Sequence, residues 1–291
     1  MGLKLALFLG CLIPTEQYAY ELSAREVLPK LGLELVDLEG FSCCGEPVRS
    51  IGSLGWLYLS TRNMAIAEGA GLDVLSLCST CHLSLCQSRH ILRNDDGLKN
   101  RLDSLLDEEG LKYEGKQKIW HLVELLHDQI GLDKIGSTVK RPLTGLRLAE
   151  HIGCHAIRPS EIGRIDDPEN PVKLKALIEA LGAESPHYPE KLDCCAYNLS
   201  ITHPDAALSI AGEKLRAIQG QGFDGVVTIC PLCQKMFDAR QSDAGASIGA
   251  SLSLPVLNYL QLLGLAMDLE GEKLGLSLNQ SPVDKILGKL R

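Results

Sequence analysis

The chain has 291 residues, of which 45% are hydrophobic and 23% charged, values typical of a soluble globular protein long enough for two ordinary domains. Its net charge is −8, it has no basic run and only 4% of its residues are aromatic, which excludes a nucleic-acid-binding surface. The apolar N-terminal run is too short to span a bilayer and lacks the strong basic region of a secretion signal. No other run is long enough for a transmembrane helix, so we expect a cytoplasmic protein with no direct membrane span.

In the first half of the chain, short apolar runs alternate with segments of helical periodicity. Pro29 is expected to kink or end the first helix early, and Gly32 to stop it. The predicted strands are 3–9, 33–38 and 73–77, and the predicted helices are 16–31, 54–69 and an amphipathic segment at 117–130.

The second half of the chain follows the same order. The predicted strands are 146–152, 185–188 and 225–229, and the predicted helices are 172–181, 205–218 and 254–267. A linker is expected at 136–144, which divides the chain into cysteine-rich domains of residues 1–143 and 144–291. The tail after Gly271 has weak periodicity and is expected to dock on a partner or fray. The pattern predicts an α/β fold: two similar Rossmann-like domains with parallel sheets, related by a pseudo-two-fold internal repeat.

Ten of the eleven cysteines form two copies of one pattern, a single Cys, a Cys-Cys pair and a C-x-x-C. The first copy is Cys11, Cys43, Cys44, Cys78 and Cys81, and the second is Cys154, Cys194, Cys195, Cys230 and Cys233. Because the single cysteines and the C-x-x-C motifs follow predicted parallel strands, each set can converge at one sheet edge. Cys86 lies outside the repeat and is expected to be a buried small apolar residue.

Thiolates in this number indicate metal binding. An odd count in a long chain with C-x-x-C pairs disfavours a disulfide scaffold. A structural zinc ion needs four ligands and would leave one cysteine of each set over, whereas adjacent cysteines suit a larger inorganic core. The pattern therefore favours iron–sulfur clusters, and a zinc-stabilised scaffold without redox activity is the alternative. The crowded C-x-x-C-x-x-C run of ordinary ferredoxins is absent.

Motifs around these cysteines carry a resemblance to a known family. Beyond the two cysteine sets, the chain resembles the tandem cysteine-rich domains of the heterodisulfide reductase B-subunit in four further stretches. These are Phe8-Leu9-Gly10-Cys11, Gly153-Cys154-His155, Cys230-Pro231-Leu232-Cys233, and Pro255-Val256-Leu257 with the segment 261–267. The chain departs from the family at Ala196-Tyr197-Asn198-Leu199, where a glycine-rich stretch usually follows the second Cys-Cys pair.

The resemblance implies a catalytic subunit with two noncubane [4Fe-4S] clusters, one per domain, each held by the five cysteines of its set. A small-molecule or protein-bound disulfide would be reduced, or reversibly formed, between the clusters. Electrons would come from a flavin-containing subunit, similar to the A-subunit of that family. They would reach this chain through a small iron–sulfur subunit, similar to its C-subunit. His155 is the candidate catalytic residue, as a donor of a proton or hydrogen bond to a leaving thiolate; a purely structural role is the alternative.

Two other functions stay open at this point. Similar cysteine-rich domains occur in electron-transfer subunits of quinone-linked or succinate/fumarate-linked reductases. The chain could also belong to a bacterial heterodisulfide reductase-like complex of sulfur oxidation.

Overall fold

The computed structural model describes residues 2–290. The strands are β1 (Leu3–Phe8), β2 (Leu33–Val36), β3 (Asp73–Ser76), β4 (Ile119–His121), β5 (Leu148–His151), β6 (Gly225–Thr228) and β7 (Val256–Asn258). The helices are α1 (Leu12–Glu16), α2 (Ala19–Val27), α3 (Ser53–Gly69), α4 (Ser79–Asn94), α5 (Asp96–Asp107), α6 (Leu122–Glu124), α7 (Leu132–Ser137), α8 (Cys154–Ile157), α9 (Lys173–Glu179), α10 (Pro204–Gly220), α11 (Pro231–Gln234), α12 (Gln241–Ser247), α13 (Tyr259–Ala266) and α14 (Asp284–Lys289). Short 3-10 or π-helical turns cover Leu28–Leu31, Glu46–Val48, Leu125–Ile130, Pro189–Leu192, Tyr197–Ile201, Lys235–Ala239 and Leu276–Leu278.

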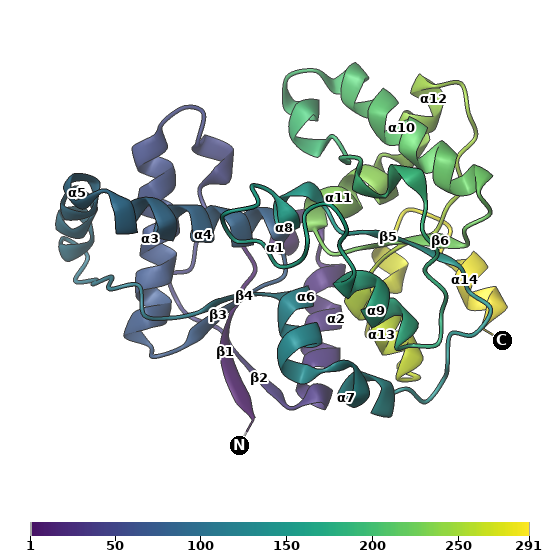
Figure 1. Ribbon diagram of the computed structural model, residues 1–291, viewed down its shortest axis with the longest axis horizontal. Coiled ribbons are helices and arrows are strands. Elements are labelled where there is room, and N and C mark those ends of the chain that lie inside the picture. The colour runs from purple at the N-terminus through teal and green to yellow at the C-terminus, as the bar shows by residue number, and fades with distance from the viewer. Residues whose placement is uncertain (1, 291) are drawn as a thin grey trace.

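Two parallel sheets organise the molecule (Figure 1). The N-terminal sheet has the strand order β2-β1-β3-β4, and the C-terminal sheet has the order β5-β6-β7. All neighbouring strands in both sheets pair in parallel. The predicted α/β fold of two Rossmann-like domains related by an internal repeat is confirmed, because β5, β6 and β7 repeat the roles of β1, β3 and β4.

The strand predicted at 185–188 does not form. Only Glu184 pairs with Arg147, as an isolated parallel bridge at the place that β2 occupies in the other sheet. Pro186 and Pro189 lack the backbone N–H that a ladder requires, so pairing stops after one residue. Side chains replace the ladder there: Ser185 donates to the Leu148 carbonyl over 3.0 Å, and Tyr188 donates to the Glu150 carbonyl over 2.7 Å.

The predicted helices at 117–130 and 254–267 are wrong in the same way, because each begins with a strand. β4 and β7 occupy the start of each segment, and the helix begins only after a capping residue. His121 accepts a hydrogen bond from the Val123 N–H over 3.2 Å, and Asn258 accepts one from the Gln261 N–H over 3.0 Å. A buried strand of three residues joined to a buried helix has no periodicity of its own, which explains the error.

The helix predicted at 16–31 is also divided in the structure. It becomes the end of α1, the helix α2 and a 3-10 turn that contains Pro29, which cannot donate to the preceding turn. Gly32 follows in the left-handed conformation, at φ 87°, and ends the segment as expected.

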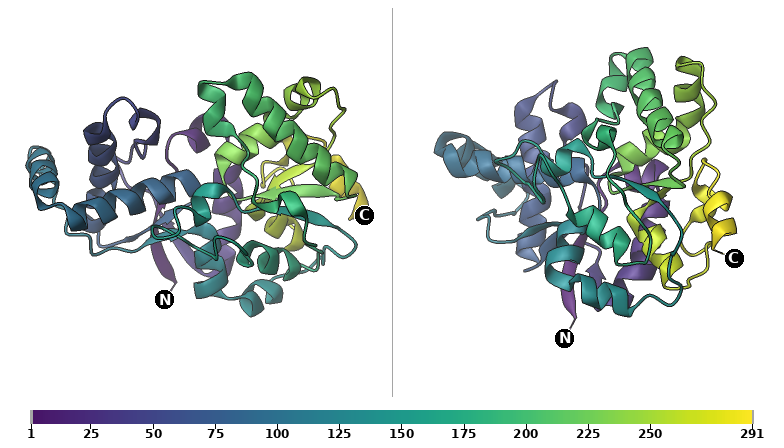
Figure 2. Two further views of the ribbon diagram at one scale, coloured as in Figure 1. Left: turned by 45° about the horizontal axis from the view of Figure 1, so that its top comes forward. Right: turned by 45° about the vertical axis from the view of Figure 1, so that its right-hand side comes forward.

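The two halves are interlocked. α2, from the N-terminal half, packs against α13, and α9, from the C-terminal half, packs against α6. Figure 1 shows the purple α2 beside the yellow-green α13, and Figure 2 shows the same neighbours from two other sides. One cluster of buried hydrophobic side chains runs through both halves, from Leu5 in β1 to Leu257 in β7. The division at residues 143 and 144 therefore stays a prediction.

The C-terminal tail packs on the chain itself. Leu274, Leu276 and Ile286 are almost fully buried in the shared core, and Gln261 donates to the Leu274 carbonyl over 3.2 Å. The expectation that the tail frays or waits for a partner is wrong for these residues, because their apolar side chains point inward. Within residues 2–290, no helix is both long enough and apolar enough to cross a membrane.

Candidate metal centres

Each cysteine set converges at the carboxyl ends of its strands, as the topology predicts. Cys11 and Cys154 follow β1 and β5, and the first cysteine of each C-x-x-C is the N-cap of α4 or α11. The Sγ atoms of Cys11 and Cys43 lie 3.5 Å apart, and those of Cys154 and Cys194 lie 3.8 Å apart. All ten cysteines are free thiols in this structure. The two sets therefore form two compact groups of five sulfur ligands.

The first cysteine of each pair is the preferred thiolate. Hydrogen bonds with Cys11 and Cys44, and then with the Gly45 N–H, lower the pKa of Cys43 to about 3. The corresponding bonds with Cys154 and Cys195, and then with the Ala196 N–H, lower the pKa of Cys194 to about 2. The same contacts raise the pKa values of Cys11 and Cys154, because the two sulfur atoms of each contact share one proton and only one of them ionises. Each site can thus hold a thiolate at neutral pH.

The residue after each Cys-Cys pair brings its backbone to the thiolate. Gly45 has φ 86° and Ala196 has φ 61°, both in the left-handed region. Their N–H groups lie 3.4 Å from the Cys43 Sγ and 3.3 Å from the Cys194 Sγ. The second site therefore keeps the backbone arrangement that glycine provides in the first, even though alanine is strained there. Gly10 has a related function, since a Cβ on it would lie 2.8 Å from the Cys81 Sγ.

The two sets meet at the boundary between the halves. The Sγ atoms of Cys78 and Cys230 lie 4.0 Å apart, the shortest approach between the sets among the sulfur contacts of residues 2–290. α1 packs against α11 and α4 against α8, so each half supplies a helix beside the other half's cysteines. This contact places the two groups of thiols next to each other and not on opposite faces.

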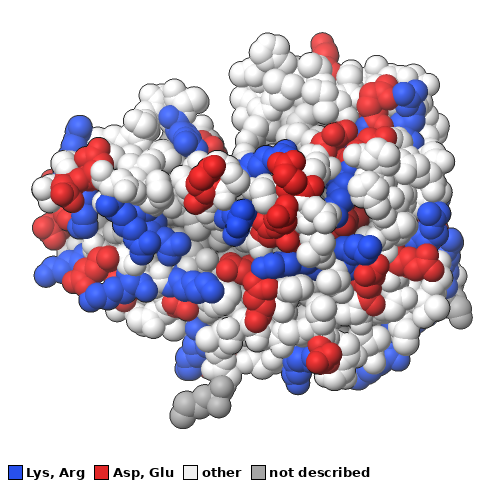
Figure 3. Space-filling view, in the orientation of Figure 1, with Lys and Arg blue, Asp and Glu red and all other residues white. Residues whose placement is uncertain are grey.

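A cavity of about 620 Å³ opens beside the first set. Its wall includes Cys11, Cys44, Cys78 and Cys81, with Tyr197, Asn198 and Leu232 from the other half. A smaller cavity of about 150 Å³ lies against the second set, and Thr80, Tyr197, Asn198 and Leu232 line both. Figure 3 shows a notch between two lobes, and the surface on either side of the notch is mostly white, with charged side chains gathered at its foot and over the rest of the face.

His155 lies on α8 and in the wall of the smaller cavity. Its Nδ1 is 2.8 Å from the Thr80 hydroxyl of the other half. Because Thr80 occupies Nδ1, Nε2 is the ring nitrogen left to act on a ligand. Whether His155 is catalytic stays a prediction.

Cys86 is separate from both sets. It is buried, as expected, and its Sγ lies 3.7 Å from the His82 Nε2. Burial raises the pKa of the Cys86 thiol to about 11, which keeps it protonated. It therefore behaves as a small apolar residue.

His151 is a functional candidate that the sequence interpretation missed. It is the last residue of β5, it is 1% exposed, and neither ring nitrogen has a hydrogen-bond partner among residues 2–290. A ring nitrogen of His151 and the Sγ atoms of Cys195 and Cys233 lie within 4.8 Å of one another. Burial lowers the pKa of His151 well below its usual value, so the ring is neutral with one N–H to donate. Aligning the two copies would have marked it, because His151-Ile152-Gly153-Cys154 matches Phe8-Leu9-Gly10-Cys11.

Lys214, on α10, is a second missed residue. It is 2% exposed, and its ammonium donates to the backbone carbonyls of Lys191 and Asp193 over 3.1 and 2.8 Å. Burial lowers the pKa of Lys214 to about 8, although nearby Asp193 and the second cysteine set oppose the shift. The side chain is thus mainly charged at neutral pH, directly behind the loop that carries Cys194.

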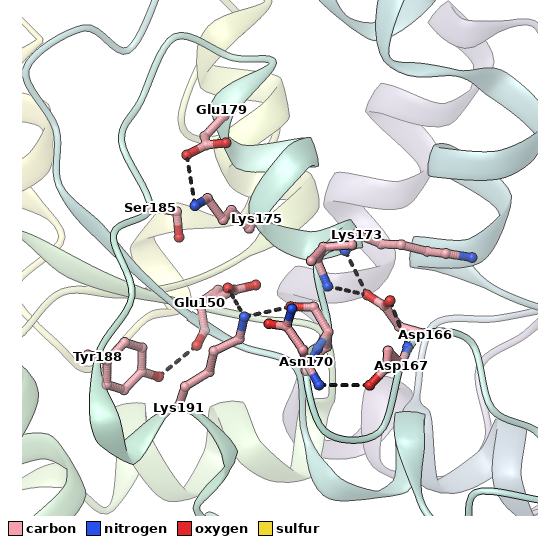
Figure 4. A network of polar contacts seen from close by, with 12 residues as sticks. Glu150, Asp166, Asp167, Asn170, Lys173, Lys175, Glu179, Ser185, Tyr188 and Lys191 are labelled. Carbon is pink, nitrogen blue, oxygen red and sulfur yellow. Dashed lines mark hydrogen bonds and ion pairs between the residues drawn. The ribbon is translucent and has the colours of Figure 1, made fainter.

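A buried ion pair joins this loop to β5 (Figure 4). The Lys191 Nζ lies 2.6 Å from the Glu150 carboxylate and also donates to the Pro171 carbonyl over 2.5 Å. Both side chains are almost fully buried, so the pair fixes the start of the Cys194 loop relative to the strand that ends in His151. Lys191 is accordingly a structural residue.

The residues present fit an iron–sulfur cluster in each half. Five sulfur donors converge in each set, and backbone N–H groups point at one thiolate of each. His151 adds an unpartnered buried nitrogen that faces the second set. Unsatisfied buried donors are rare unless a further group satisfies them, so these observations favour an additional polar or metallic group at the site.

Comparisons with known proteins agree with this geometry. A family model described as a cysteine-rich domain matches the chain twice, at residues 5–86 and 148–238. The B-subunit of the ferredoxin/F(420)H(2)-dependent CoB-CoM heterodisulfide reductase of Methanosarcina acetivorans is 36% identical over 99% of this chain and 97% of its own length. The chain belongs to the heterodisulfide reductase B-subunit family. The names of its relatives in this family describe them as B-subunits of heterodisulfide reductases, which are oxidoreductases.

One relative of similar length is named as a subunit of a different kind of reductase. The Wolinella succinogenes 8-methylmenaquinol:fumarate reductase membrane anchor subunit is 31% identical over 98% of this chain and all of its own length. Among solved structures, a hypothetical protein from Helicobacter pylori superposes with a TM-score of 0.77 at 19% identity, over 96% of this chain and 52% of that chain. That structure supports the fold alone.

Proposed function

We propose that the chain is the catalytic subunit of a heterodisulfide reductase-like complex. It would bind one noncubane [4Fe-4S] cluster in each half, through the two cysteine sets, and reduce or reversibly form a disulfide in the cavity between them. Reduction of a disulfide consumes two electrons and two protons and releases two thiols. Such clusters, when bound, would supply one-electron redox chemistry and iron atoms that can hold thiolate sulfur.

The observation that carries this proposal is the meeting of the two cysteine sets around shared cavities. Cys78 and Cys230 lie 4.0 Å apart at the boundary, and four residues line both cavities. Each cavity is lined by cysteines of one set only, so a ligand would have to extend across the four shared residues to meet both groups of thiols. That arrangement suits a reaction in which two sulfur atoms separate and each needs its own partner.

Residues of the cavity wall have separate roles in the proposal. His155, held at Nδ1 by Thr80, would give a proton through Nε2 to one leaving thiolate. Arg49 lines the larger cavity, where Gln87 holds its guanidinium over 2.7 Å, and it would meet a negatively charged substituent of the disulfide. Tyr197 and Asn198 line both cavities and would select which thiol fits.

The electrons must come from other chains, because no ferredoxin motif or dinucleotide fingerprint is visible in the sequence. We assign the donors to two further subunits, one a small iron–sulfur protein and the other flavin-containing, as the family resemblance implies. We also place the complex in the cytoplasm, which agrees with the reducing conditions that free thiols require.

An electron-transfer subunit of a fumarate-linked or quinone-linked reductase is the second candidate. The name of the Wolinella succinogenes relative, which matches over its full length, supports it. In that case the same two clusters would pass electrons on without binding a disulfide. A disulfide assay on the purified complex separates the two candidates.

Zinc is the competing metal, and one observation favours it. His151, Cys195 and Cys233 offer three ligand atoms within 4.8 Å of one another, a set that a tetrahedral ion accepts. The first set has no such group, since Phe8 occupies the matching position. A zinc scaffold would hold one ion in the second half.

Anaerobic purification with iron, zinc and acid-labile sulfide analysis tests the cluster proposal directly. We expect iron and sulfide in amounts that fill both sites and little zinc. Stoichiometric zinc with little sulfide would rule the proposal out. Native purification of the complex should yield flavin and a ferredoxin-like protein, and the complex should reduce a disulfide with electrons from an artificial donor.

Replacement of Ala196-Tyr197-Asn198 by three glycines tests the specificity argument. Because Tyr197 and Asn198 line both cavities, we expect the relative kcat/KM values for different disulfides to shift by about tenfold, since roughly 1.4 kcal/mol of differential binding suffices. The matched control is Ala196→Gly alone, which leaves both side chains in place. Unchanged substrate ratios in the triple variant would contradict the assignment.

A further inference from the structure

The two cysteine sets are alike in most features that set the reduction potential of a cluster. Each set contains one exposed cysteine, one of intermediate exposure and three buried ones. Each receives a backbone N–H from the left-handed residue after the Cys-Cys pair. The numbers of exposed and buried cysteines and this backbone hydrogen bond are therefore the same in both sets, although the exposed cysteine is Cys11 in the first and Cys194 in the second.

The last residue of the first strand in each half differs. It is His151 beside the second set and Phe8 beside the first. His151 packs edge-to-face on Phe237, with ring centroids 4.8 Å apart, and Phe8 packs in the same way on Phe41 at 5.2 Å. The rings thus have similar settings, but only His151 has an N–H. That N–H has no partner among residues 2–290 and faces Cys195 and Cys233.

The helix that braces the Cys-Cys loop differs as well. Asn63 is the eleventh residue of α3, and Lys214 is the eleventh of α10. Asn63 donates to the Cys43 carbonyl over 3.0 Å, and Lys214 donates to the Asp193 carbonyl over 2.8 Å. Both hold the loop in the same manner, but Lys214 adds a buried positive charge behind the second set. The Asp193 carboxylate that also lies near it is at the surface, where water screens it.

In the C-x-x-C segments it is the first set that has the extra polar side chains, but these side chains already have hydrogen-bond partners. Ser79 and Thr80 stand where the second set has Pro231 and Leu232. The Ser79 hydroxyl lies 3.1 Å from the His121 Nε2, and the Thr80 hydroxyl lies 2.8 Å from the His155 Nδ1. These hydroxyls are therefore not available to stabilise a reduced cluster in the first set as the His151 N–H and the Lys214 ammonium would in the second.

We propose that His151 and Lys214 raise the reduction potential of the C-terminal cluster above that of the N-terminal cluster, so that the first electron to enter the protein is held in the C-terminal half. The inference rests on the proposed iron–sulfur function. A one-electron carrier loses one electron and the C-terminal cluster gains it, which makes the cluster one charge more negative. An imidazole nitrogen within 4.8 Å of two of its sulfur ligands, free to donate an N–H, and a buried ammonium both stabilise that more negative form. His151 and Lys214 are positioning residues for charge and take no part in bond breaking.

A potentiometric titration followed by electron paramagnetic resonance tests this on the iron-loaded protein. Two waves are expected for the wild type. His151→Phe introduces the residue found at the first site. It should lower the midpoint potential of the higher wave only, by about 59 mV or more, which is a tenfold change in the one-electron reduction equilibrium. The matched control Phe8→His should raise only the lower wave. His151→Gln retains an N–H donor and should stay within a few-fold of the wild type.

Lys214→Met provides a second test that does not depend on the imidazole ring of His151. It should lower the midpoint potential of the same higher wave. A single wave in the wild type, a higher wave that stays in place in both His151→Phe and Lys214→Met, or a shift of the lower wave instead would each overturn the inference. Iron and sulfide are measured on the same samples. Wild-type protein without them refutes the proposed function, whereas full loading with unmoved potentials refutes only the assignment of His151 and Lys214.

Discussion

Gly45 and Ala196 hold the same left-handed position after their cysteine pairs, but their surroundings are different. A Cβ on Gly45 would lie 2.8 Å from the Trp56 carbonyl oxygen, which is backbone and cannot move away cheaply. We expect Gly45→Ala to lower the free energy of unfolding by about 1–3 kcal/mol, from left-handed strain and this clash. Ala196→Gly should change it by less than about 1 kcal/mol, because relief of strain is offset by greater freedom of the unfolded chain.

Anaerobic denaturant unfolding of both variants, with iron content measured beforehand, checks this pair. Equal losses in the two variants would show that the left-handed position, and not the Trp56 contact, decides the cost. A stable Gly45→Ala protein with a full complement of iron would contradict the close approach described at the first site.

His121 predicts a pH dependence of stability. Burial, and then the nearby ring of His82, lowers the pKa of His121 to about 3, although Cys230 opposes the shift. The folded protein therefore resists protonation that the unfolded chain accepts below its ordinary pKa of about 6.5. The stability that neutral His121 contributes is present above that value and is lost as the pH falls toward 3, by about 2 kcal/mol at pH 5.

The measurement is the unfolding free energy of the wild type and of His121→Asn between pH 8 and pH 5. The groups that face His121 are His82 and Ser79 of α4 and the more distant Cys230. All of them remain in the variant, so the difference in slope belongs to His121. Parallel pH profiles for the two proteins would be the contrary outcome.

A residue such as His151 was beyond the sequence interpretation for a physical reason. In the segment 146–152, His151 is a polar residue near the end of an apolar strand. The sequence of that segment does not show that its ring is buried without a hydrogen-bond partner. Its significance comes from Cys195 and Cys233, which are far away in the sequence and near in space. Only the comparison of the two copies, with Phe8 at the matching place, carries a signal of it in the sequence.

At the scale of elements, the strands that deliver cysteines were predictable and the last strand of each sheet was not. β1, β3, β5 and β6 are apolar runs with a cysteine within the next three residues, so their position follows from the pattern. β4 and β7 have three residues each and run directly into capped helices, which hides them inside longer apolar stretches. The strand predicted at 185–188 is reduced to a single bridge at Glu184, because the prolines that follow have no backbone N–H to donate.

Because each cysteine set is built from the strand ends of its own sheet, loss of one ligand should affect one cluster. We predict that Cys43→Ala removes the N-terminal cluster and leaves the C-terminal one, and that Cys194→Ala does the reverse. Each variant should retain about half of the wild-type iron, with one electron paramagnetic resonance signal left. Complete loss of iron in a variant that still shows wild-type circular dichroism would refute separate assembly.

At the scale of the whole molecule, the shared core makes the two halves depend on each other. Leu5 and Leu257 belong to one buried cluster, and α2 and α9 each pack on helices of the other half. We predict that fragments 1–143 and 144–291, expressed separately, are unfolded or aggregated, because each exposes the apolar face that the other covers. Co-expressed, they should form a soluble one-to-one complex.

Size-exclusion chromatography and circular dichroism of each fragment, alone and together, provide the check. A full-length chain cut only at the linker is the control for the break itself. Cooperative unfolding of either fragment by itself would show that the packing of α2 on α13 is dispensable.

The reciprocal exchange of helices also bears on the origin of the chain. α2 reaches across to α13 and α9 reaches across to α6, so each contact has a counterpart related by the same rotation. Two copies of a single-domain ancestor would meet in this way in a symmetric homodimer, where every contact occurs twice. In that ancestor the thiols that became Cys78 and Cys230 would have been one residue facing its own copy across the dimer axis. Gene duplication and fusion would then have released the copies from identity, and only after that event could one strand end in histidine and the other in phenylalanine.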